Sequence, residues 1–363
     1  MKGRTLILLC AAMTIALLAF WGRPRHSAPR TEPMEESPAA PVQTDVTQPV
    51  LPPVEPSVVS TEPKSSTTNI VGRLLQGEEV PRLTDEQIGP YLAANRRSAG
   101  SLLAASRVTG DKAWLLEAME KYPNDPRVNF VAVFKSGSPE TRRQWLEAFR
   151  KSAPDNALPF YLSALDAFKA GNLEEAVTEL AVASTKRQYQ DYSLDFIQNA
   201  QEAYQSAGYS EAEAKVISSS ELPLPQLAQL KQVGRNIADM VTTYRQAGDE
   251  ASAQALLQMG MTLSQRAGSG QSFLINDLLG IAIERQMLGT MDPSSLLDNS
   301  GQTVQTRLDE LTKRRDAIKA WGKQAEGVMP TMSETDLANY FERMKTFGES
   351  SAMQWLAEKY GTP

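Results

Sequence analysis

A helix–turn–helix pattern with a glycine at each turn recurs along the middle of the chain, and this recurrence limits the possible fold more than any other feature. A glycine stands between two helical patterns at five places, namely Gly110, Gly137, Gly171, Gly208 and Gly248. Successive glycines are 27, 34, 37 and 40 residues apart. One helix pair of this size cannot bury its own apolar surface, so the pairs must pack against one another. The sequence therefore predicts an all-α fold in which four or five helix pairs stack as an α-solenoid.

The middle pair, with its turn at Gly171, has the clearest pattern. In its first helix Phe160, Ala164 and Ala167 follow one another at i, i+4 and i+7, and so they form a single apolar stripe. The glycine can adopt the left-handed conformation that ends a helix. In the second helix one face is predicted to be apolar and the other acidic. The apolar face carries Leu173, Ala176, Val177, Leu180 and Ala181.

These positions resemble the packing positions of the tetratricopeptide repeat family. Phe160 stands where the family has a Trp, and Ala164 stands where it has a Gly. Ala176 and Leu180 supply its A-x3-F pair. A second unit matches about as well, through Ile237, Val241, Tyr244, Gly248, Ala253 and Leu257.

The resemblance covers about residues 112–267, and one unit departs from it. Around Gly137, Asn129 and Arg142 occupy positions that should be apolar and small. The resemblance implies a right-handed superhelix whose concave face is lined by the first helix of each pair and binds peptides or proteins. It implies no catalytic residue.

Composition argues against several classes of function. The formal net charge of −6 disfavours a nucleic-acid partner, because phosphate contacts need clustered Lys and Arg. The one histidine, His26, and the one cysteine, Cys10, both precede the helical patterns. The folded region therefore has no Ser-His-Asp or Cys-His pair and lacks the usual zinc ligands. We predict no catalytic residue, no metal site and no cofactor.

The first 22 residues predict a membrane anchor. The uncharged run 5–22 has 18 residues. As a helix it spans about 27 Å, close to the bilayer core of about 30 Å. No good cleavage site follows, so we favour an uncleaved anchor over a cleaved signal peptide or a buried soluble helix. The positive-inside count is nearly balanced, but we favour a cytoplasmic N-terminus. The protein is then a single-pass inner-membrane protein whose bulk is extracytoplasmic or periplasmic.

Residues 23–68 are predicted to be a disordered linker. Ten of the 22 prolines lie there, with almost no aromatic residues and no helical period. Such a segment cannot bury enough apolar surface to fold. We interpret it as a spacer that holds the folded part away from the membrane. The alternative is a Pro-rich docking tract, since Pro-x-x-Pro occurs at 38–41, 49–52 and 53–56.

Helices are also predicted before the repeats, in residues 69–111. Thr84 is placed to cap a helix, and acidic residues follow it in the first turn. One apolar side is predicted for this helix, formed by Ile88, Tyr91, Leu92, Leu102 and Leu103.

Residues 268–363 are predicted to form further helices. Segment 271–288 is very apolar but contains three charged residues, so we interpret it as a buried helix and not as a second membrane span. A long amphipathic helix is predicted at 303–325, and Ser333 begins another with a capping-box pattern. We expect this region to form a helical cap at the open end of the solenoid, where a polar outer face is needed.

A second stripe on the first helices suggests a binding groove. Tyr161, Leu165 and Phe168 are not needed to pack the central pair, and Lys169 ends their stripe. Aromatic and cationic groups side by side suit an extended peptide that carries a carboxylate. The alternative is that the stripe packs on the neighbouring repeat. The predicted groove consists of Arg127, Phe134, Lys135, Tyr161, Leu165, Phe168 and Lys169.

These observations predict a membrane-tethered scaffold of the cell envelope that binds protein or peptide partners and performs no catalysis. One alternative is a structural homo-oligomer that spaces the membrane from another layer. Another is an all-α hydrolase that uses only carboxylates. A deep pocket with two facing buried carboxylates would support the hydrolase.

Overall fold

The computed structural model describes residues 70–220, 222–268, 273–297 and 301–361. Within these ranges every regular element is helical, and strand-type pairing is limited to isolated bridges between Asn156 and Gln188 and between Leu296 and Thr303. The all-α prediction is thus confirmed for the described part of the chain. None of the helices in these ranges combines the length and the apolarity needed to cross a bilayer. The predicted anchor and the Pro-rich linker lie outside the described residues.

The predicted helix pairs are present, and each predicted turn glycine lies between the two helices of a pair. Gly110 and Gly171 have φ values of 80° and 78°, the left-handed region in which glycine has no steric penalty. The pairs are α4 (Ala99–Thr109) with α5 (Lys112–Lys121), α6 (Pro126–Lys135) with α7 (Pro139–Ser152), α8 (Leu158–Ala170) with α9 (Leu173–Thr185), α10 (Ser193–Ser206) with α11 (Glu211–Ser220), and α12 (Pro225–Gln246) with α13 (Glu250–Gly268).

The remaining helices flank these pairs on both sides. They are α2 (Ile70–Leu75) and α3 (Asp85–Ala94) before the pairs, and α14 (Leu274–Leu288), α15 (Val304–Val328), the short 3-10 helix η1 (Met329–Thr331), α16 (Glu334–Phe347) and α17 (Glu349–Tyr360) after them. Thr84 caps α3 in a capping box with Gln87, and Ser333 caps α16, as predicted. One prediction was wrong. The helix that starts after Thr84 does not reach Leu102, because the backbone turns at Arg96 and Arg97, which have φ of 52° and 48°.

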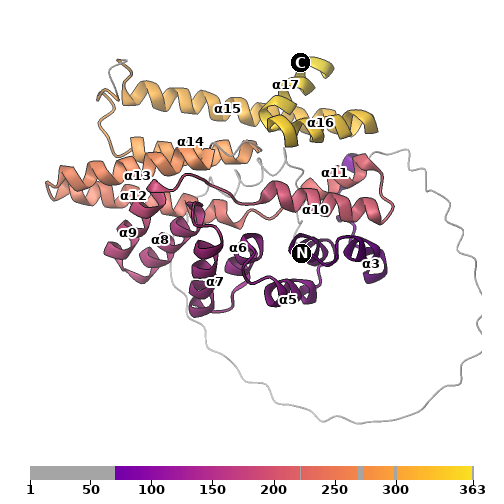
Figure 1. The fold of residues 1–363 in the computed structure, drawn as a ribbon. Helices are drawn as coiled ribbons and strands as arrows, with labels where there is room; N and C mark the ends of the chain where they lie inside the picture. Colours follow the sequence, from indigo (N-terminus) through magenta and orange to yellow (C-terminus); the bar gives the residue numbers. More distant parts are fainter. Residues whose placement is uncertain (1–69, 221, 269–272, 298–300, 362–363) are drawn as a thin grey trace, which may run out of the picture.

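The helices pack in a solenoid-like arrangement whose order differs from the order of the chain (Figure 1). The pair α8–α9 packs directly on α12–α13, since α8 meets α12 and α9 meets α13. The pair α10–α11, which lies between them in sequence, folds back instead. Its first helix packs on α3 and α4, and its second helix packs on α16 and α2. The stack therefore runs directly from α8–α9 to α12–α13. The pair α10–α11 lies beside it and connects α3 and α4 with α16.

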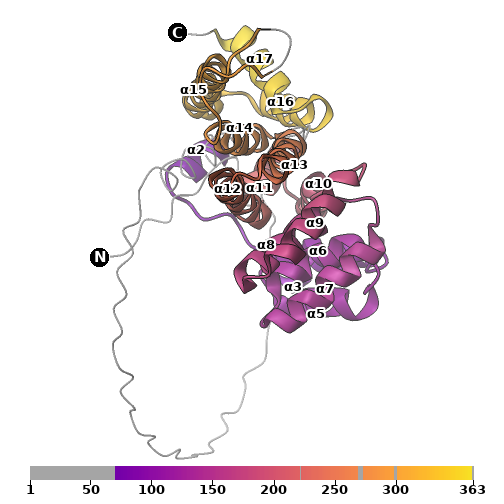
Figure 2. The ribbon, with the colours of Figure 1, turned by 90° about the vertical axis from the view of Figure 1, so that its left-hand side faces the viewer.

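The long helices α12 to α15 form layers that Figure 2 shows nearly end-on. In this region the backbones of α13 and α14 touch. A Cβ added at Gly280 would lie 2.8 Å from the Cα of Gly268, and one added at Gly260 would lie 2.0 Å from the sulfur of Met287. The hydroxyl of Ser264 donates to the carbonyl of Gly280 at 2.9 Å. Only glycine allows the two backbones to approach this closely. Most residues of α14 are buried, as predicted for this helix.

Arginines connect helices that are distant in sequence. Arg266 of α13 donates to the carbonyls of Ala183, Ser184 and Lys186 at the end of α9. The last carbonyls of a helix have no partner within it, so this side chain caps α9 from another pair. Arg107 of α4 likewise donates to carbonyls of α10 and α11.

Candidate functional site

The predicted groove residues lie on two first helices, α6 and α8. Tyr161 and Leu165 of α8 are enclosed, with 0% and 1% of their surface exposed. Burial raises the pKa of Tyr161, and its hydroxyl accepts a hydrogen bond from Arg266 at 3.4 Å. These two residues belong to the core and cannot line an open groove. For them the alternative interpretation, packing within the stack, is the one that fits.

The face of α4 and α6 that would be open in a simple solenoid is covered by α10. Phe130 of α6 stacks on Phe196 of α10 with ring centroids 5.9 Å apart, and Tyr192 meets the same ring edge-on at 6.1 Å. On α4, a Cβ at Gly100 would lie only 3.1 Å from the amide of Asn199. Aromatic pairs of this geometry add to the energy of burial. On α4, and at Phe130 of α6, the surface of the first helices is therefore occupied by α10 and its N-terminal residue Tyr192.

Asn156 directs the chain from α9 back to α10. Its side-chain oxygen accepts from the amides of Leu158 and Gln190, both at 3.1 Å, and its amide donates to the carbonyl of Gln190 at 2.8 Å. One side chain thus binds the first amide of α8 and holds the strand-like segment that precedes α10. Tyr192 then starts α10 with φ of 58°, a conformation that is costly for a bulky residue. The aromatic contacts of Tyr192 offset this cost.

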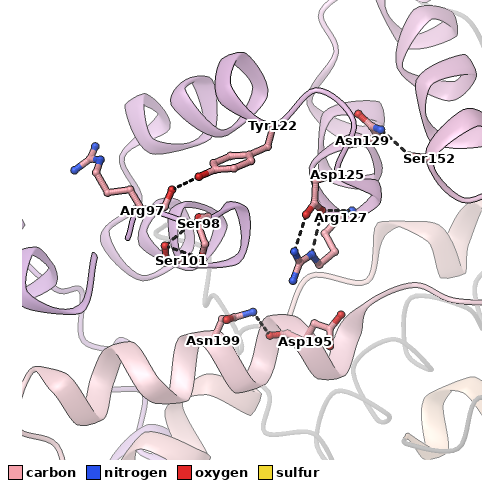
Figure 3. A network of polar contacts seen from close by, with 10 residues as sticks. All are labelled: Arg97, Ser98, Ser101, Tyr122, Asp125, Arg127, Asn129, Ser152, Asp195 and Asn199. Atoms are coloured by element: carbon pink, nitrogen blue, oxygen red, sulfur yellow. Dashed lines mark hydrogen bonds and ion pairs between the residues drawn. The ribbon is translucent and has the colours of Figure 1, made fainter. Parts of the chain in front are cut away.

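Arg127 is engaged within the molecule. Figure 3 shows its guanidinium turned onto Asp125, with Asp195 and Asn199 on the facing helix α10. Two hydrogen bonds of 3.0 and 2.6 Å join the two side chains. Hydrogen bonding to Asp125 raises the pKa of Arg127. Burial alone would raise the pKa of Asp125, but its bonds to Arg127 and the charge of that residue lower it. Asp125 therefore already supplies Arg127 with a carboxylate.

Arg142 brings four helices together beside Phe134. Its guanidinium lies 5.7 Å from the ring of Phe134, donates to Asp166 of α8 at 2.7 Å and donates to Gln229 of α12 at 2.9 Å. The same aspartate lies 3.8 Å from the ammonium of Lys169. The sequence marked Arg142 only as a departure from the repeat pattern. Its pairing with a carboxylate explains how a charged residue is accommodated there.

Five of the seven predicted residues are at least partly accessible, and four of them lie outside the Arg127–Asp125 pair. Lys135 and Lys169 are exposed at the C-terminal ends of α6 and α8, where cations are favoured by the helix dipole. Phe134 and Phe168 are half-buried beside them. We call these four residues the α6–α8 edge. Arg142 of α7 contacts both helices, through the ring of Phe134 and the carboxylate of Asp166. This surface is smaller than the predicted groove, because Arg127, Tyr161 and Leu165 do not contribute to it.

Metal ligands and buried carboxyl groups are the remaining candidates for chemistry in the described residues. Among them, no group of three or more His, Cys, Asp and Glu side chains could hold a metal ion. Glu349 and Asp277 are carboxyl groups whose pKa is raised by burial, and the charge of Asp277 acts on Glu349. Glu349 is only 2% exposed, and Asp277 is paired with Arg314 at 3.3 Å. The Glu349 carboxyl is therefore enclosed by the protein.

Comparisons with known proteins identify no relative of this chain. Neither a family model nor a curated protein nor a solved structure matches it. The resemblance to tetratricopeptide repeats rests on the positions quoted above. The function must therefore be inferred from the surfaces of the chain itself.

Proposed function

We propose that the protein is a membrane-tethered scaffold of the cell envelope that binds a protein or peptide through its helical stack and performs no catalysis. The observation that carries this proposal is the α6–α8 edge, where two exposed lysines adjoin two half-buried aromatic rings. The tetratricopeptide-like character of the central unit is supported by burial. Phe160, Ala164, Ala176 and Leu180, which stand at the packing positions of the family, are all buried. The tether is the apolar run 5–22.

The chemistry of the edge favours an acidic partner. Lys135 and Lys169 supply positive charge, and Phe134 and Phe168 supply apolar area. An extended peptide with one or two carboxylates matches both. Since both lysines are near the surface, salt should weaken the interaction.

We infer that α15, α16 and α17 cap the stack. Five positions of α15 are buried, and four of them, Val304, Leu311, Ile318 and Ala325, recur every seven residues and form a narrow seam; the fifth is Gly322. Its exposed positions include Asp309, Lys313, Asp316 and Lys323. A polar outer face of this kind ends a stack and discourages further stacking. This argues against the alternative in which the protein is an oligomeric spacer.

A charge-reversal experiment tests the proposed function. Lys135→Glu and Lys169→Glu are introduced together in the full-length protein, and partners are crosslinked and captured from native membranes. We expect partners that bind wild type at low salt to be lost from the double variant. Lys151→Glu is the matched control, because Lys151 is an exposed lysine on α7 away from the edge. An unchanged set of partners in the double variant would contradict the proposal.

A further inference from the structure

Glu349 is a buried carboxyl at the joint between two helices. It is the first residue of α17 and follows Gly348, which ends α16 with φ of 85°. One of its oxygens accepts the amide of Leu274, the first residue of α14, at 2.7 Å. The other oxygen has no hydrogen-bond partner among the described residues. Glu349 therefore lies between the N-termini of α14 and α17, and no cation of the described residues is paired with it.

The charged groups on the neighbouring helices do not neutralise this carboxyl. Asp277 of α14 is the charged group that acts on it, and Asp277 is itself paired with Arg314 of α15. Both helix N-termini favour a negative charge. Burial and the negative charge of Asp277 disfavour the ionised form of Glu349.

The charged residues of α16 act elsewhere. Asp336 pairs with Lys359 at the opposite end of α17, and Arg343 lies over the ring of Trp355. On its far side, α16 meets α11, where Lys215 pairs with Glu342. The C-terminal hairpin α16–α17 thus has one ion pair within it, Asp336–Lys359, and one at its contact with α11, Lys215–Glu342. Where it meets α14, no ion pair among the described residues includes Glu349.

We propose that Glu349 is a protonation-controlled latch that holds the hairpin α16–α17 on α14 when its carboxyl is neutral and loosens the hairpin when the carboxyl is ionised. A neutral carboxyl keeps the bond from Leu274 and carries no charge into the core. An ionised one is stabilised when the hairpin moves and water reaches it. The latch is independent of the α6–α8 edge and goes beyond the proposed function.

The direction of the pH effect follows from the raised pKa of the Glu349 carboxyl. Burial, and then the charge of Asp277, raise the pKa of Glu349 from an ordinary value of 4.5 to about 7. The pKa of Glu349 is higher when the hairpin is docked than when it is open. Docking is therefore strongest at acid pH and weakens as the pH rises from about 4.5 to about 7. From about pH 5.5 to about pH 8.5, the ratio of loosened to docked hairpin should rise roughly 30-fold.

Hydrogen–deuterium exchange of the full-length protein tests the latch. Exchange of segment 334–360 is measured at both pH values and corrected for the intrinsic exchange rate. Wild type should lose roughly 30-fold in protection between the two pH values. Glu349→Gln should show little change, because the amide has the same shape and stays neutral. Glu358→Gln, an exposed change on the same helix, should behave like wild type.

Two results would overturn the latch. The first is wild-type protection of 334–360 that does not depend on pH after correction. The second is a Glu349→Gln variant that loses as much protection as wild type. If Glu349→Gln does not fold, Asp277→Asn replaces it. This variant removes the neighbouring negative charge, so the transition should move to lower pH, and an unmoved or raised midpoint contradicts the proposal.

Discussion

The pairs α6–α7 and α8–α9 and the layers α12 to α15 are both stacks of helices, but they are held together differently. In the former the helices have 10 to 14 residues, and they meet through aromatic rings and arginine–carboxylate pairs. In the latter α12 and α15 have 22 and 25 residues, and glycines bring the α13 and α14 backbones into contact. Large side chains therefore set the distance between helices in the short pairs. In the long layers the glycines, which have no side chain, set the distance between α13 and α14.

This difference predicts that the two regions respond to opposite kinds of substitution. The short pairs should be sensitive to removal of side-chain volume, because their rings fill the space between helices. The long layers should be sensitive to added volume, because their backbones already touch. The following variants test this contrast, in order of decreasing effect.

Removal of a ring from the short pairs should have the largest effect. Tyr161→Ala empties a site that is 0% exposed, so the free energy of unfolding should fall by about 3–5 kcal/mol. Phe168→Ala, at a half-buried site of the same helix, should cost clearly less. Urea unfolding followed by circular dichroism measures both. A Tyr161→Ala variant as stable as wild type would mean that this side chain is not part of the core.

Addition of one methyl group to the long layers should come next. Gly280→Ala forces α14 away from α13, and the cost should be about 2 kcal/mol. Gly327→Ala is the matched control, because an added Cβ there meets nothing within 4 Å. In an exposed helix position this change should stabilise by roughly 0.5–1 kcal/mol. Equal effects of the two substitutions on the unfolding midpoint would remove the basis for the contrast.

Loss of the arginine cap that joins the two regions should cost somewhat less. Arg266→Met keeps most of the aliphatic volume but leaves three carbonyls at the end of α9 without this donor. We expect a loss of about 1–2 kcal/mol in unfolding free energy. Arg235→Met, at an exposed position of α12, serves as the control and should change little. If both variants unfold at the same urea concentration, the cap does not stabilise the junction.

Charge reversal at the α6–α8 edge should have the smallest effect on stability. Lys135→Glu and Lys169→Glu alter exposed side chains, so each should change the unfolding free energy by no more than about 0.5 kcal/mol. Thermal unfolding of the two single variants measures this. A large drop in melting temperature would show that these lysines stabilise the stack, and loss of partner binding could then no longer be assigned to the edge.

The sequence predicted local features well, because they depend on neighbours in the chain. Thr84, Ser333 and the glycine at 171 are found at the helix ends where they were expected. One exception is Leu173, which was assigned to an apolar face but is 52% exposed. It lies at the start of α9, where the next pair does not cover it.

The placement of α10 was beyond what a periodic pattern can tell. The pattern shows that residues 193–206 have an apolar face, but not which helix that face meets. The contacts that decide it, Phe130 with Phe196 and Gly100 with Asn199, are distant in sequence. Arg142 was missed for a similar reason, since its partners Asp166 and Gln229 belong to other pairs.

The position of α10 against α6 is the central claim, because it decides which faces of the stack a partner can reach. A double-mutant cycle on Phe130 and Phe196 tests it directly, using Phe130→Leu, Phe196→Leu and the double variant. Rings with centroids 5.9 Å apart should give a coupling energy of about 0.5–1.5 kcal/mol in urea unfolding. Strictly additive losses would contradict the contact, and the surface of α6 around Phe130 would then be open.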